Sequence, residues 1–172
     1  MWYLVALIPV FVLCSCKKDE PASQPSGTDP CGMVSGIHHT DVMGALLYPY
    51  DSTDWRAFDE WCPEVEALFA DLAPVTYSAS VPDSLLIACF PNPSASLFRF
   101  GFYRDDSARV DLRITNADHQ LLCSFDSLMV NAFILDLDSV GIPSGQLARV
   151  YYRVTHPDGT AHRGHGDVQL GM

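Results

Sequence analysis

Four ionisable side chains near the end of the sequence are its nearest approach to a metal-ligand set. They are His156, His162, His165 and Asp167, and neutral imidazoles and a carboxylate bind zinc when they converge. On a strand that starts at His162, His165 and Asp167 share one face and His162 lies on the other. Gly164 and Gly166 could change this alternation through a bulge or the close approach of another backbone. We therefore predict no metal site and no cofactor, and we interpret the segment as a solvated edge strand.

The common motifs of nucleophilic and nucleotide-dependent enzymes are missing from the sequence. It has no G-x-S-x-G elbow, no G-x-G-x-x-G loop and no Walker pattern. Asp136 and Asp138 could contact calcium but lack EF-hand spacing, and His38 and His39 form a polar pair in a loop. We therefore expect a protein that is not an enzyme. A metal-dependent hydrolase, using His165, is kept as the second alternative function.

Aromatic side chains offer another kind of site, because their rings can stack on sugars. Trp55, Trp61 and Tyr151 are the candidates for such glycan contacts. A small β-sandwich also uses large aromatic residues in its core. A carbohydrate-binding surface protein is therefore the first alternative function.

Four cysteines follow the N-terminal apolar run and its adjoining cysteines: Cys31, Cys62, Cys89 and Cys123. An even number in an oxidising compartment permits disulfides, with three possible connectivities. Their spacings match no C-x-x-C zinc pattern. Cys89 and Cys123 lie in apolar runs, where a buried free thiol is equally at home. Cys31 and Cys62 are the candidate disulfide, which would tie an N-terminal tether to a helix.

Short strands must position most of these residues, because apolar runs recur about every twelve residues from Leu85 onward. Alternate residues share a face in three of the runs, namely Phe98, Phe100 and Phe102; Val110, Leu112 and Ile114; and Val150, Tyr152 and Val154. The runs are Leu85–Phe90, Leu97–Tyr103, Arg109–Thr115, Leu121–Asp126, Ala132–Leu137, Leu147–Thr155 and His162–Leu170. Seven short alternating strands predict an immunoglobulin-like antiparallel β-sandwich over residues 81–172.

Residues 32–80 are expected to form an acidic, partly helical extension of this sandwich. Large apolar residues recur at spacings of three and four from Trp55 to Leu72, which is typical of one face of a helix. Acidic residues, Asp54 among them, take the other face. Because Pro63 lacks an N–H group, two short helices or one kinked at Cys62 are expected. The apolar stripe is expected to pack on the sandwich.

The N-terminal residues predict export and a flexible tether. Residues 1–15 contain an apolar run of twelve residues from Trp2 to Leu13, which is the length of a signal-peptide core and too short to span a membrane. Residues 16–31 are rich in proline, serine and glycine and lack apolar periodicity. Such a segment cannot offset the entropy of folding, so it stays extended.

The residues at the end of the apolar run resemble the bacterial lipobox. Leu13 would stand at −3, Ser15 at −1 and Cys16 at +1. The resemblance implies cleavage before Cys16, a diacylglycerol thioether on its sulfur and an N-linked acyl chain such as palmitate. Cys14 competes as acceptor but would place bulky Leu13 at −1. Two or more acyl chains hold a protein firmly on a membrane.

The residues that follow Cys16 carry a second resemblance. Cys16-Lys17-Lys18-Asp19-Glu20 is similar to the Cys-x-Lys-acid-acid export signal of Bacteroidota lipoproteins, with Lys18, Asp19 and Glu20 as the signal residues. This similarity implies a location at the outer membrane, anchored by lipid and exposed at the cell surface.

The sandwich segment resembles the type IX secretion C-terminal sorting domain. That family opens with Tyr-Pro-Asn-Pro, which compares with Phe90-Pro91-Asn92-Pro93, and Leu135-Asp136-Leu137 is similar to its later L-x-L segment. The Gly-x-Tyr of the family is replaced by Gly145-Gln146-Leu147. The resemblance implies a β-sandwich fold and a link to secretion.

The formal net charge of −11 limits the partners. An acidic chain is repelled by phosphate backbones and anionic headgroups, so nucleic acid is excluded as a partner. The sequence therefore predicts a lipid-anchored envelope protein, with a non-enzymatic role in adhesion or docking to envelope proteins or glycan.

Overall fold

The computed structural model describes residues 36–51, 54–57, 61–80, 85–103 and 107–171. The expected signal peptide (1–15) and tether (16–31) lie outside these residues. Within them the protein is mainly β, with two short helices, α1 (Pro63–Ala67) and α2 (Leu137–Val140).

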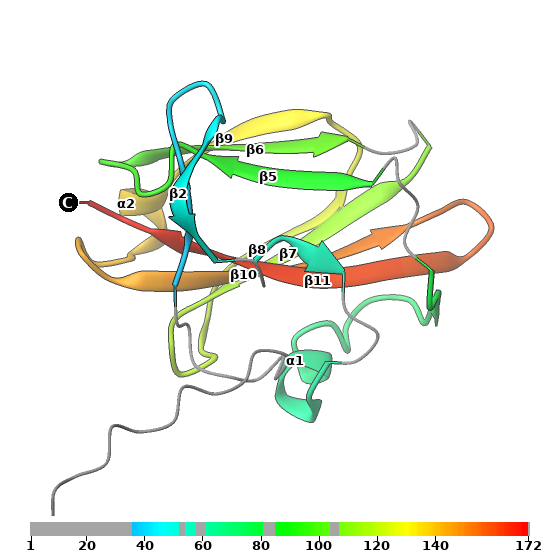
Figure 1. The fold of residues 1–172 in the computed structure, drawn as a ribbon. Coiled ribbons are helices and arrows are strands. Elements are labelled where there is room, and N and C mark those ends of the chain that lie inside the picture. The colour runs from blue at the N-terminus through cyan, green and yellow to red at the C-terminus, as the bar shows by residue number, and fades with distance from the viewer. Residues whose placement is uncertain (1–35, 52–53, 58–60, 81–84, 104–106, 172) are drawn as a thin grey trace, which may run out of the picture.

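Seven strands build an antiparallel β-sandwich from the C-terminal half of the chain (Figure 1). One sheet has the order β5-β6-β9, and the other contains β11-β10-β7-β8. The strands are β5 (Leu86–Phe90), β6 (Leu97–Tyr103), β7 (Arg109–Thr115), β8 (Leu121–Leu128), β9 (Ala132–Asp136), β10 (Leu147–Thr155) and β11 (Thr160–Gln169). The three strands of one sheet face these four strands of the other, which gives the expected immunoglobulin-like sandwich. In the larger sheet, β8 pairs with β7.

The core lies between the two sheets and is built from the predicted alternation. Phe98, Phe100 and Phe102 of β6 face Val110, Leu112 and Ile114 of β7, and all six side chains are at most 4% exposed. Val150, Tyr152 and Val154 of β10 complete the same layer. Burying such residues is the main stabilising contribution, at roughly 1.5–3 kcal/mol for each large apolar side chain.

Asn92 fastens the corner between β5 and β6 to the opposite sheet. It is fully buried, and its Nδ2 donates to the Asp167 carbonyl (2.8 Å) while its Oδ1 accepts from the Gln169 N–H (3.0 Å). Its backbone also pairs with Thr40. The Pro-Asn-Pro corner thus holds β11 and an N-terminal segment in place through one amide side chain.

The extension contributes strands as well as helix, and the expected helical stripe from Trp55 to Leu72 is wrong in its first part. The elements are β1 (His38–Thr40), β2 (Leu46–Tyr50), β3 (Arg56–Ala57), α1 and β4 (Thr76–Tyr77). Pro63 starts α1, where its missing N–H costs nothing. Arg56 and Ala57 instead pair with His165 and Gly164. At this point, hydrogen bonds to the open edge of β11 decide the backbone conformation, and the helical spacing of the apolar residues does not.

Backbone hydrogen bonds therefore join the acidic extension (residues 32–80) to the sandwich (residues 81–172). β3 pairs with β11 antiparallel and β4 pairs with it in parallel, so the larger sheet has six strands. Figure 1 shows α1 beneath this sheet, on the side away from β5, β6 and β9.

Candidate functional site

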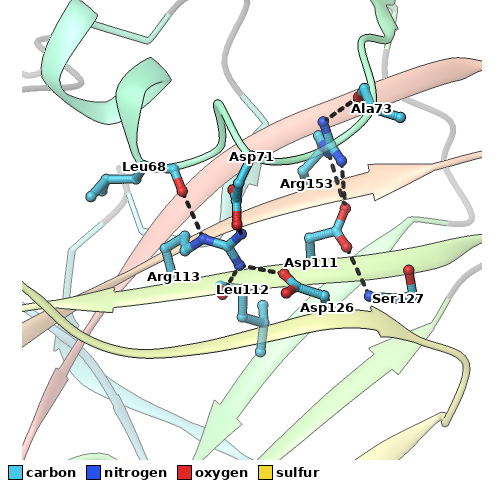
Figure 2. Close-up of polar contacts among 9 residues, drawn as sticks. All are labelled: Leu68, Asp71, Ala73, Asp111, Leu112, Arg113, Asp126, Ser127 and Arg153. Atoms are coloured by element: carbon cyan, nitrogen blue, oxygen red, sulfur yellow. Dashed lines mark hydrogen bonds and ion pairs between the residues drawn. The ribbon is translucent and has the colours of Figure 1, made fainter.

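Buried arginines attach the extension to the outer face of the larger sheet (Figure 2). Arg113 is 1% exposed, and its Nε donates to the Leu68 carbonyl (2.7 Å). Its other nitrogens reach the carboxylates of Asp126 (2.6 Å) and Asp71 (3.1 Å). Arg153 donates from Nε to Asp111 Oδ2 (3.0 Å) and from Nη1 to the Ala73 carbonyl (3.1 Å). These bonds hold a segment that has only five residues of helix.

Apolar packing completes this attachment and covers two of the residues proposed for glycan contact. Trp61 stacks on Phe69 with ring centroids 4.5 Å apart, and Val65 and Tyr151 belong to the same buried cluster. Trp61 is 6% exposed and Tyr151 is fully buried. The expected packing of the apolar stripe on the sandwich is therefore found, but neither ring offers a face to a sugar in solution.

A β-hairpin formed by β1 and β2 (residues 38–50), which we call the apolar hairpin, projects from the sandwich beside β5 (Figure 1). Its turn is ordered, because Asp41 Oδ1 accepts from the N–H groups of Met43 (2.8 Å) and Ala45 (2.9 Å). The Gly44 backbone lies against the Phe90 ring. Large apolar side chains nevertheless stay exposed: Val42 (74%), Met43 (82%), Leu46 (51%), Leu47 (47%) and Tyr48 (89%).

A cavity of about 490 Å³ opens between the apolar hairpin, β3 and β5. Trp55, Leu46 and Ile87 supply much of its apolar wall. The residues with polar side chains that line it are His38, Thr40, Asp54, Arg56 and Cys89. The volume lies within the range of small-molecule binding sites, roughly 300–1,000 Å³.

Asp54 is the buried ionisable group of this cavity. It is 2% exposed, and its Oδ2 accepts from the His38 N–H (2.8 Å) while its Oδ1 accepts from the Asp167 N–H (3.1 Å). Burial raises the pKa of Asp54 to about 8, and the nearby Asp167 carboxylate raises it further. The two backbone N–H bonds act in the opposite direction and lower the pKa. A carboxyl with such a pKa in a cavity is a candidate for binding or proton transfer.

Behind Asp54 lies an ion pair between two buried residues. Arg149 donates from Nε to Asp167 Oδ1 (2.7 Å) and from Nη2 to Asp167 Oδ2 (2.9 Å). Their side chains are 5% and 1% exposed. Burial lowers the pKa of the neighbouring His165 to about 3, and the Arg149 charge contributes, so its imidazole is neutral at neutral pH.

Trp55, next to Asp54, adopts an unusual backbone conformation. Its φ is +59°, a value that bulky residues rarely take and that costs about 1–3 kcal/mol. Its N–H donates to the His165 carbonyl (2.7 Å). Its indole lies over Gly166, where a Cβ would come within 2.2 Å of the ring. Gly166 is thus a position where another chain segment makes a close approach.

The predicted face alternation of the histidine and aspartate cluster is confirmed, but its solvated setting is wrong. His165 and Asp167 pair with Tyr151 and Arg149, whereas His162 pairs with Val154 on the core side of β10. All three are at most 5% exposed. His165 lies against the Tyr151 ring, Asp167 pairs with Arg149, and His162 lies against the His156 ring. No group of three metal-binding side chains occurs in the described part of the chain.

The cysteines fall into two kinds. Cys62 is disulfide-bonded, whereas Cys89 and Cys123 are free thiols. Burial raises the pKa of Cys89 well above its ordinary value, and the Asp54 charge adds to the rise. Cys31, the partner expected for Cys62, lies outside the described residues, as do the lipidation residue Cys16 and the export signal residues Lys18, Asp19 and Glu20.

Sequence reasoning placed Asp54 on an exposed helical face, and no pattern indicated the cavity. One signal was present in the sequence: the glycines at 164 and 166 leave room for another chain segment, and Trp55 with its neighbours fills it.

Comparison with known proteins adds little to this description. No family model matches the chain, and no curated protein matches it in sequence. Among solved structures, the spore cortex lytic enzyme SleM of Clostridium perfringens is 9% identical, with a TM-score of 0.35. The aligned part covers 57% of this chain and 29% of SleM. In the described segments, no helix is long and apolar enough to cross a membrane.

Proposed function

We propose that this chain is a lipid-anchored protein of the outer membrane, exposed at the cell surface, that docks onto an envelope protein without catalysing a reaction. The lipobox-like residues up to Cys16 and the export-like residues Lys18 to Glu20 support the anchor and the location. The apolar hairpin supports the docking role and is the observation that carries it.

The exposed side chains of the apolar hairpin support protein docking because of their number and their rigid frame. Contiguous exposed apolar residues mark interaction sites in soluble proteins, and a preformed turn lowers the entropy cost of binding. The hairpin region, residues 36–51, contains Asp41 and Asp51 but no lysine or arginine. Elements that lie on membranes usually carry such cations, so a protein partner suits the hairpin better than a lipid surface.

The anchor is tested by replacing its sulfur. In Cys16→Ala, a precursor that keeps residues 1–15 or a protein lost from the membrane fraction is expected, because no thioether can form. Cell fractionation and mass spectrometry of the mature N-terminus measure this. Cys14→Ala is the matched control and should leave the lipid in place. A Cys16→Ala protein that stays acylated would contradict the anchor.

The docking surface is tested by replacing three of the most exposed apolar side chains of the hairpin. A variant with Val42→Ser, Met43→Ser and Tyr48→Ser should keep its stability, since these residues are at least 74% exposed. It should lose cross-linking to its envelope partner in intact cells. Met129→Ser with Ile134→Ser, which removes apolar residues exposed elsewhere, is the matched control and should retain the cross-links. Equal cross-linking in both variants would rule out the hairpin.

The two alternative functions receive less support from the same residues. Trp61 and Tyr151 are buried, which leaves Trp55 as the glycan candidate that reaches a cavity. His162 lies on the opposite face of β11 from His165 and Asp167, so the three do not form the ligand set that a metal-dependent hydrolase needs.

A further inference from the structure

We propose that the cavity beneath the apolar hairpin binds a small aliphatic amine, whose ammonium group pairs with the Asp54 carboxylate while its hydrocarbon part lies against Trp55, Leu46 and Ile87.

The first step is the environment of the buried Asp54 carboxyl. Its carboxyl accepts two N–H bonds from the backbone, from His38 and Asp167, and makes no ion pair with any residue in the described ranges. A buried carboxylate without a cation is unstable, which is why its pKa rises instead. A ligand ammonium would supply the missing charge.

The second step is the balance of charges around the cavity. Three carboxyl groups act on one another here, Asp51, Asp54 and Asp167. Arg149 is committed to Asp167 by two hydrogen bonds, and Arg56 is an exposed residue at the cavity wall. Burial lowers the pKa values of His38 and His165, so both imidazoles are neutral at neutral pH. Asp54, with a pKa of about 8, is protonated at neutral pH, and an ammonium ion bound beside it would favour its ionised form.

The third step is the shape and lining of the cavity. Its walls are largely apolar, which suits an alkyl chain, and the Trp55 ring beside Asp54 can contact a cation through its face. A six-carbon amine fits well within about 490 Å³. A largely apolar cavity with a few polar groups is the usual design of a small-molecule site.

The test is calorimetric titration of the purified full chain with hexylammonium, hexanol and hexanoate. Hexylammonium should bind with one site per chain and about tenfold or more tighter than hexanol, the gain of a charge-assisted hydrogen bond. Hexanoate should bind no better than hexanol. Equal affinity for the alcohol, tighter binding of hexanoate, which would assign the site to Arg56, or no heat at millimolar amine would overturn the proposal.

Variants locate the site. Asp54→Asn should lose about tenfold or more in amine affinity, whereas Arg56→Gln should leave it unchanged or raise it, because a repelling charge is removed. If Asp54→Asn fails to unfold cooperatively, Leu46→Trp gives the same information. Leu46 is 51% exposed, so a larger side chain there should narrow the cavity without disturbing the core and should weaken amine binding. Amine affinity that survives both Asp54→Asn and Leu46→Trp would place binding elsewhere.

Discussion

Replacing Arg149 with methionine is expected to lower the free energy of unfolding by about 3–5 kcal/mol, the largest effect that we predict for a single substitution. The substitution keeps most of the apolar stem but leaves the Asp167 carboxylate, 1% exposed, without its cation. Asp54 lies beside Asp167, so two buried carboxyls would then lie together without the arginine that pairs with Asp167. Chemical denaturation followed by circular dichroism measures the change.

Two controls separate the loss of the ion pair from a general loss of packing. Adding Asp167→Asn to Arg149→Met should recover much of the stability, because the uncompensated charge is removed. Arg113→Met is the matched substitution at another buried arginine. Its partners Asp71 and Asp126 have side chains that are 69% and 46% exposed, so water solvates them when the arginine is lost. A loss at Arg113 as large as that at Arg149 would contradict this explanation.

The sandwich was predictable because its strands follow one simple rule. Side chains at Phe98, Phe100 and Phe102 alternate with others at a period of two, and turn residues separate each run from the next. The predicted ranges for β6, β7 and β10 agree with the structure at both ends. Local alternation and turn chemistry decide such elements, and both can be read directly from the sequence.

The extension was less predictable because long-range contacts decide its structure. Trp55 to Ala57 follow a helical spacing, yet they pair with a strand more than a hundred residues away, at His165 and Gly164. Among the described residues of the extension, α1 is the α-helix, and it starts at Pro63. Periodicity reports which side chains are apolar, and it does not report which distant backbone offers a free edge.

The candidate site was missed for a related reason. Charged residues are usually exposed, so Asp54, His165 and Asp167 were assigned to solvent. In the structure all three are buried, and Arg149 compensates the charge of Asp167. The same fold that buries these groups leaves Val42 and Met43 exposed, which is the reverse of what their chemistry favours. The buried charged residue Asp54 and the exposed apolar hairpin both border the cavity at the edge of the sandwich.

Stability should fall by about 2 kcal/mol between pH 6.5 and pH 8, because Asp54 holds a proton in the folded chain that it lacks in the unfolded chain. Its pKa rises from 3.8 to about 8 on folding, so its contribution is complete below the lower value and is lost as the pH rises through the higher one. The pKa of His165 falls from 6.5 to about 3, which has the opposite sign: folding releases a proton, and stability is lost as the pH falls below 6.5. The two slopes oppose each other from about pH 4 to 6.5. Above pH 6.5 that of Asp54 remains, and burial also raises the pKa of Asp167, which contributes with the same sign.

Urea unfolding at pH 5, 6.5 and 8 measures this dependence of stability on pH. Two variants show which residue causes each part of it. Asp54→Asn should remove the decline between pH 6.5 and 8, whatever its effect on absolute stability, because an amide does not titrate. His165→Gln should extend the decline down toward pH 4, since the opposing slope is gone, although His38 and His162, whose pKa values burial also lowers, keep part of it. A wild-type chain that gains stability from pH 6.5 to 8 would mean that Asp54 is ionised when folded. The cavity would then already hold its compensating charge, and the carboxyl that the amine is proposed to meet would be paired by the protein itself.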